Sequence, residues 1–258
     1  MSQREPIFNM PAGTLHFLTV IIAVHLILAG LWYTDGTEFK ENYNWVLRSL
    51  AFIPIRYFDH SITIPGGDLA SYTAVITYMF VHANMEHLII NSLCILAFGS
   101  AIARRMSYGR FILYTLICGI SGVGLHFWFY PVSYQAVIGA SGAASGFIAG
   151  AMVLIVSAYR NKQTYLIRQN PAQIRLMSVY EFFTEPRILF IIAIWVLLNW
   201  LMGDFGLGVS GDVQVAWEAH LGGYIAGTFG IFLLDRPYSD NRSDYSSGQT
   251  PDDENSQI

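Results

Sequence analysis

The sequence predicts an all-α, polytopic membrane protein with a bundle of six membrane-spanning helices. Of its 258 residues, 53% are hydrophobic and 12% are charged, whereas roughly 25% are charged in an average soluble domain. The mean hydropathy of +0.42 and the 15% aromatic content exclude disorder for most of the chain. The net charge of −4 is small and the basic residues form no groove-sized cluster, so we expect no nucleic-acid partner.

Six apolar stretches account for the predicted spans, because a bilayer core about 30 Å thick needs about 20 apolar residues per helix. They cover residues 15–32, 88–103, 111–129, 136–158, 188–202 and 213–234. We expect the second stretch to extend backwards over residues 72–85. The third and fourth lie in a segment, residues 111–159, that contains no Asp, Glu, Lys or Arg, which leaves room for two helices and a short connection.

The chain divides into a cytoplasmic N-terminal segment (1–14), the membrane domain (15–234) and a disordered cytoplasmic tail (235–258) rich in Ser, Asp, Asn and Gly. Six spans put both termini on one side, and most Lys and Arg residues fall on that side, so the positive-inside rule makes it the cytoplasm. No cleavable signal peptide or transit peptide is recognisable, which favours a bacterial plasma membrane. Cys94 and Cys118 lie in apolar runs and are expected to be reduced.

A serine between glycines begins the fourth span. Ser141 lies in the motif Gly-Ala-Ser-Gly (139–142), where a loop-to-helix turn exposes the hydroxyl beside free backbone N–H groups suited to a developing oxyanion. Taken alone, the motif is explained better by close packing, because Gly142, Gly146 and Gly150 form a stripe of small residues. The two interpretations are compatible.

A second polar cluster begins the sixth span. His220, Gly223 and Gly227 share one helix face, and a glycine-lined face would fit against the stripe of the fourth span. This would bring His220 towards Ser141. Glu218 is about 200° around the helix from His220, so we expect it at the aqueous rim rather than as a partner of the histidine.

The third cluster enters the second span, where His87 and Asn91 are four residues apart and face the same way. Structural roles are possible for each cluster alone. However, the second, fourth and sixth spans all run inward, and each carries its cluster at its outer end. A nucleophile, a base and two hydrogen-bond donors at one depth are the components of a hydrolase site.

These motifs resemble the rhomboid family of intramembrane serine proteases over nearly all of residues 15–234. The matching motifs are residues 77–82 followed by His87 and Asn91, then 139–142, then 219–220 with Gly223 and Gly227. The resemblance implies a six-helix fold and cleavage of transmembrane substrates near the outer membrane face through an acyl-enzyme. It implies no cofactor and no metal, and it identifies no oligomeric state.

Carried over by position, the resemblance makes Ser141 the nucleophile and His220 its general base. His87, Asn91 and the Ser141 backbone N–H match the oxyanion donors. His82, Gly139, Gly142, Gly223 and Gly227 match structural positions near the site. One departure concerns Ser145, which stands where the family often has an aromatic residue packed on the catalytic imidazole.

Three alternatives remain open. The chain could be a catalytically silent relative that binds membrane helices for transport or quality control. It could hold zinc through His82, His87 and His220, although no H-E-x-x-H motif is present. A small-solute transporter is disfavoured because the sequence contains no internal repeat.

Overall fold

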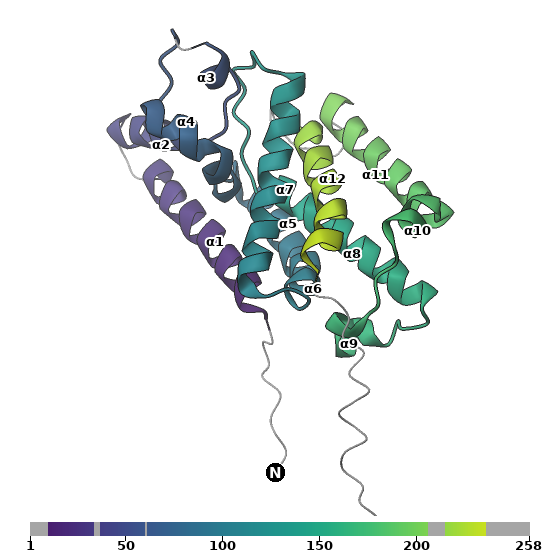
Figure 1. The fold of residues 1–258 in the computed structure, drawn as a ribbon. Helices are drawn as coiled ribbons and strands as arrows, with labels where there is room; N and C mark the ends of the chain where they lie inside the picture. The colour runs from purple at the N-terminus through teal and green to yellow at the C-terminus, as the bar shows by residue number, and fades with distance from the viewer. Residues whose placement is uncertain (1–9, 34–36, 60, 206–214, 236–258) are drawn as a thin grey trace, which may run out of the picture.

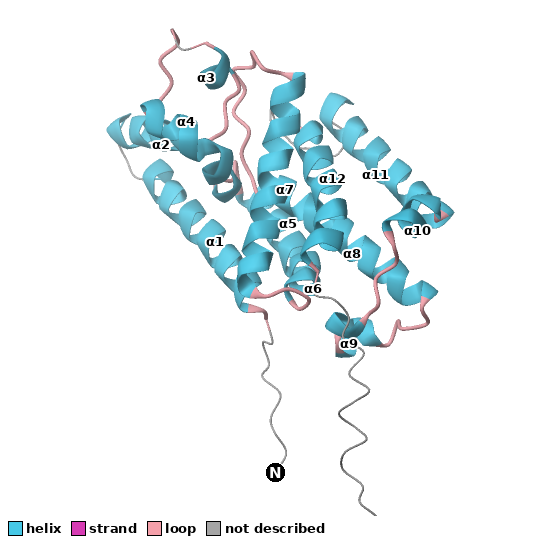
Figure 2. Ribbon diagram, viewed as in Figure 1, coloured by secondary structure: helices cyan, strands magenta, loops and turns pink. Residues whose placement is uncertain are grey.

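The computed structural model describes residues 10–33, 37–59, 61–205 and 215–235. The regular secondary structure of the described part is helical, with loops between the helices and one isolated antiparallel bridge between Phe52 and Val137 (Figure 2). This confirms the predicted all-α class. Of the predicted terminal segments 1–14 and 235–258, residues 1–9 and 236–258 lie outside the described residues.

Long helices form the body of the molecule (Figure 1). Their bounds are α1 (Ala12–Tyr33), α5 (Met85–Cys94) continued by the π-helical η2 (Ile95–Gly99) and α6 (Ser100–Ala103), α7 (Tyr108–Phe129), α8 (Ser141–Arg160), α11 (Pro186–Phe205) and α12 (Trp217–Leu234). Short helices connect them: α2 (Thr37–Leu50), α3 (Ile55–Phe58), α4 (Gly67–Thr77), η1 (Tyr78–Phe80), α9 (Leu166–Gln169), η3 (Pro171–Gln173) and α10 (Val179–Thr184).

In the described residues, five helical segments are long and apolar enough to cross a membrane: those beginning at Ala12, Met85, Tyr108, Ser141 and Pro186. The protein is therefore a multi-pass membrane protein. The sixth predicted span, α12, is not among the five, because its glycines and polar residues lower its apolarity. It packs mainly against α7 and α8. A helix that packs against other helices exposes fewer side chains to lipid, so it can contain more glycine and polar residues.

Two predicted boundaries were wrong. Residues 72–85 do not extend the second span, because the chain becomes extended at Val81 and α5 begins only after the N-cap Asn84. Residues 136–140 do not belong to the fourth span, because Val137 pairs with Phe52 and Gly139 has φ +111°. A residue with that backbone conformation cannot continue a helix.

Both ends of the membrane domain lie at one end of the bundle. At the start of α1, Gly13 packs against the ring of Phe111 near the start of α7. Arg105, in the turn between α6 and α7, donates to both carboxylate oxygens of Asp235 just after α12, at 2.9 and 2.5 Å. Because the chain enters and leaves the bundle at the same end, it passes along the bundle an even number of times. The two cysteines of the chain, Cys94 in α5 and Cys118 in α7, are free, as predicted.

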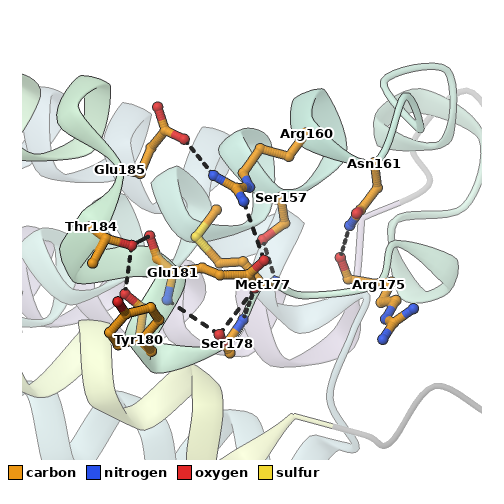
Figure 3. A network of polar contacts seen from close by, with 10 residues as sticks. All are labelled: Ser157, Arg160, Asn161, Arg175, Met177, Ser178, Tyr180, Glu181, Thr184 and Glu185. Atoms are coloured by element: carbon orange, nitrogen blue, oxygen red, sulfur yellow. Dashed lines mark hydrogen bonds and ion pairs between the residues drawn. The ribbon is translucent and has the colours of Figure 1, made fainter.

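A polar network joins α8 to the start of α11 at the same end of the molecule (Figure 3). Arg160 pairs with Glu185 at 2.6 Å and with Glu181 at 3.2 Å. The buried Ser157 hydroxyl accepts the N–H of Met177 at 3.0 Å. These contacts fasten the α8–α11 connection to the end of α8.

Candidate active site

Ser141 is the first residue of α8. Ala140 before it is the N-cap and offers no side-chain acceptor. The first helical hydrogen bond comes from the N–H of Ala144, 2.9 Å from the Ala140 carbonyl. The N–H groups of Ser141, Gly142 and Ala143 therefore point out of the start of the helix. There they could donate hydrogen bonds to an oxyanion.

The loop before Ser141 allows no side chain at Gly139. A Cβ there would lie 2.6 Å from the His87 ring, and φ is +111°. The His87 imidazole of α5 thus lies directly against the backbone two residues before Ser141. This contact explains why the motif requires glycine at position 139.

Backbone hydrogen bonds hold that loop in place. The Gly139 N–H donates to the Tyr78 carbonyl at 2.9 Å, and the Ala140 N–H donates to His82 Nε2 at 3.4 Å. Burial, and then the neighbouring His87 and His25, lower the pKa of His82 to about 3. His82 consequently stays neutral and able to accept. The geometry supports the structural role that was expected for it.

The predicted oxyanion donors lie one turn apart on α5. Asn91 is 3% exposed, and its amide donates to the His87 carbonyl at 2.9 Å. The Asn84 side chain caps the helix by accepting the His87 N–H at 2.8 Å. The N-cap at Asn84 and the regular geometry of α5 therefore fix the backbone positions from which the His87 and Asn91 side chains extend.

A glycine seam sets the register between α8 and α12. A Cβ on Gly223 would overlap the carbonyl of Gly142, and one on Gly227 would overlap the backbone of Gly146. The Tyr114 hydroxyl of α7 lies 2.7 Å from the Gly146 carbonyl and 2.8 Å from that of Gly227. The close approach predicted for the glycine stripe is present.

This register relates the two helix starts. Ser141 precedes Gly142 by one residue, and His220 precedes Gly223 by three residues, almost one helical turn. The carbonyl of Ala219 lies against both Gly142 and Gly122 of α7. The first turn of α12 therefore packs between the start of α8 and α7. His220, the residue after Ala219, belongs to this closely packed turn.

A polar partner of His220 was missed by the sequence analysis. The Nδ1 atom of His220 lies 2.8 Å from Oδ1 of Asn199 in α11. An asparagine in an apolar stretch was the available signal, because polar side chains inside a span usually have a reason.

Glu218 does not lie at the aqueous rim, so that part of the prediction was wrong, although its carboxylate pairs with His126 rather than with His220. It is 3% exposed and lies 3.2 Å from Nδ1 of the buried His126 in α7. The two residues border a cavity of about 210 Å³, lined also by Tyr130, Ser133, Gln135, Val215, Ala216 and Trp217. The error arose because only the angle from His220 was considered, whereas α7 covers that other face.

The zinc alternative finds no support in the geometry. Within the described ranges, no group of three His, Cys, Asp or Glu side chains is arranged to hold a metal ion. His82 and His87 contact each other edge to face, with ring centroids 5.1 Å apart.

Comparison with known proteins supplies the family. The rhomboid domain family matches residues 70–237, which include every candidate site residue. One relative, "Rhomboid protease GluP" of Bacillus subtilis (strain 168), is 29% identical over 163 residues, covering 63% of this chain and 26% of that protein. This chain thus matches about a quarter of the relative's length. The fold, the motifs and the domain match agree: the chain belongs to the rhomboid family.

Proposed function

We propose that the protein is an intramembrane serine protease that cleaves transmembrane helices near the outer membrane face. The observation that carries the proposal is the uncapped start of α8 at Ser141, with the His87 ring against its loop and the glycine seam bringing α12 alongside. The relative whose printed name is a rhomboid protease adds support.

In the proposed reaction, Ser141 Oγ attacks a substrate peptide carbonyl while Nε2 of His220 accepts the hydroxyl proton. The carbonyl oxygen becomes an oxyanion, which receives hydrogen bonds from the Ser141 N–H and from His87 and Asn91. The C–N bond then breaks as His220 returns the proton to the leaving nitrogen, and the acyl-enzyme forms. Water, deprotonated by His220, hydrolyses the ester and regenerates Ser141.

The substrate class follows from the setting of the site. Carbonyls of an intact helix are already hydrogen-bonded, so a substrate helix must unwind locally before it is attacked. We infer that small or helix-breaking residues near the outer end of a substrate helix favour cleavage. From the basic residues at the end shared by α1 and α12 and the positive-inside rule, we propose that both termini are cytoplasmic and that the membrane is a bacterial plasma membrane.

The deciding experiment labels the purified protein with a fluorophosphonate probe and follows cleavage of a transmembrane substrate. We expect the adduct at Ser141, and loss of both labelling and cleavage in Ser141→Ala and His220→Ala. Ser145→Ala, one turn along α8, is the matched control and should retain both. A Ser141→Ala variant as active as the wild type would refute the proposal.

A graded test concerns the oxyanion donors. Asn91→Ala should lower kcat by up to about 10²- to 10³-fold, the effect of removing one such donor in serine proteases. If the wild type binds membrane helices but neither cleaves them nor reacts with the probe, the catalytically silent alternative is correct.

A further inference from the structure

The contact between His220 and Asn199 goes beyond the expected Ser-His pair. Asn199 comes from α11, twenty-one residues away in sequence, and its Oδ1 lies 2.8 Å from His220 Nδ1. Both side chains are partly buried. A hydrogen bond removed from bulk water is geometrically persistent, because few competing partners are available.

The orientation of the Asn199 amide is fixed by its other end. Its Nδ2 donates to the carbonyl of Trp195, one turn earlier in α11, at 2.9 Å. Reversing the amide would place two carbonyl oxygens together. Oδ1 therefore faces the imidazole, and because it can only accept, the hydrogen must be on Nδ1 of His220.

This assignment has a direct consequence for the base. A neutral imidazole with hydrogen on Nδ1 has its lone pair on Nε2. Only that tautomer can take a proton from a serine hydroxyl through Nε2, and an acceptor at Nδ1 also stabilises the imidazolium that forms.

Aromatic packing does not supply this restraint. Position 145 is a serine, and none of the ring contacts in the described part of the chain involves His220. The aromatic residues nearest to His220 along α12 pack elsewhere: Trp217 lies against Phe129 of α7, with centroids 6.0 Å apart, and Tyr224 packs on Trp195 of α11, with centroids 4.3 Å apart. The α11–α12 contact is thus an aromatic pair next to a polar pair.

We propose that Asn199 is a positioning residue, which holds His220 in the tautomer and rotamer that leave Nε2 free for Ser141. The inference deepens the proposed protease function and rests on it. It assigns to α11 the orienting role for which the sequence analysis had named no residue.

The kinetic test compares Asn199→Ala, Asn199→Asp and the control Leu198→Ala, which alters a lipid-side residue of the same helix. We expect Asn199→Ala to lower kcat at least about 10- to 100-fold, the effect of removing a hydrogen-bond partner that orients a metal-ligating histidine, with KM within about twofold. Asn199→Asp keeps an acceptor and should recover most of kcat. Leu198→Ala should match the wild type.

The pH profile adds a readout that a purely structural residue would not move. A carboxylate at position 199 stabilises the imidazolium, so the acid limb of kcat/KM should shift to higher pH in Asn199→Asp. The other titratable groups near His220 are His87 on α5 and Glu218 on α12, and both are unchanged in these variants.

Side-chain ¹⁵N NMR of His220 tests the tautomer without requiring activity. We expect a protonated Nδ1 and an unprotonated Nε2 in the wild type, and a mixture of tautomers in Asn199→Ala. If Asn199→Asp fails to fold, Asn199→Ala and the NMR spectrum decide the matter. An unchanged kcat in Asn199→Ala, or a loss of activity with the tautomer unaltered, would overturn the positioning role.

The two proposals fail in different ways. Absence of Ser141 labelling in the wild type contradicts the protease function, whatever Asn199 does. Normal labelling and cleavage in both the wild type and Asn199→Ala contradict only the positioning role.

Discussion

Two of the helices that contact α12, α8 and α11, pack in opposite ways. In the most apolar 18-residue stretch of each helix, 83% of the residues are buried in α8, whereas only 11% are buried in α11. The α8 side is a seam of glycines in backbone contact, while the described α11 side relies on larger side chains, chiefly Trp195 against Tyr224 and Asn199 against His220. The serine thus belongs to a rigid part of the bundle, and the histidine's polar partner belongs to a loosely packed one.

This difference suggests a division of tasks within the proposed site. Backbone contact leaves α8 and α12 little freedom to shift, because interiors at this density do not deform gradually. The α11 helix has few buried contacts, and local stability follows buried contact. The start of α11 is fastened by the polar network of Figure 3, so the C-terminal half of the helix depends on its contacts with α12.

The largest predicted effect comes from filling the glycine seam. Gly223→Ala places a methyl group on the Gly142 carbonyl, and we expect it to lower the free energy of unfolding by about 3 kcal/mol or more. The thermal midpoint in detergent micelles measures this. Gly124→Ala on α7, where a Cβ meets nothing within 4 Å, is the control and should be neutral or stabilising. Equal midpoints would contradict the seam.

Next in size is the buried pair between α7 and α12. His126→Leu leaves the Glu218 carboxylate buried without its histidine, and we expect a loss of about 2–3 kcal/mol in unfolding free energy. The double variant His126→Leu/Glu218→Leu should regain much of that loss, because no polar group is then stranded. A double variant as unstable as the single one would argue that shape, not pairing, matters here.

A smaller effect is expected at the hydroxyl that bridges the seam. Tyr114→Phe removes the group lying between the carbonyls of Gly146 and Gly227, at a cost of about 1 kcal/mol. Tyr134→Phe, at a residue 61% exposed, should leave the thermal midpoint unchanged. A Tyr114→Phe midpoint equal to that of Tyr134→Phe would contradict the role of the hydroxyl.

The smallest effect concerns the cap of α10 in the polar network. The Glu181 carboxylate accepts the N–H and hydroxyl of Ser178, and these bonds, followed by Arg160, lower its pKa below 4.5. A depressed pKa contributes stability above the ordinary value, which is lost as pH falls through the folded-state value. Amide exchange at residues 178–184 should therefore accelerate as the pH falls below the ordinary pKa of a glutamate and through the lowered pKa of Glu181. In Glu181→Gln, exchange corrected for its intrinsic rate should show no such step.

Periodicity and apolar run length predicted the long helices within a few residues where the pattern was uninterrupted. The third span was predicted at 111–129, and α7 is Tyr108–Phe129. The errors occurred where apolar residues continue through a non-helical stretch. Residues 136–140 are as apolar as a helix, but the bridge to Phe52 and the backbone of Gly139 override that pattern.

The candidate site divides along a similar line. Serine, histidine and glycine motifs could be identified in sequence because their spacing within one helix is fixed. Partners from other helices could not, as Glu218 with His126 and Asn199 with His220 illustrate. Neither pair has a sequence spacing that local geometry constrains.

By itself, then, the sequence determined that this chain enters a membrane, which segments are helical and which side chains are chemically unusual there, since these follow from local composition and helical period. Only the tertiary structure decided which polar groups meet. Helix packing depends on the shapes of whole faces, and it set the Gly142–Gly223 register and brought Asn199 to His220.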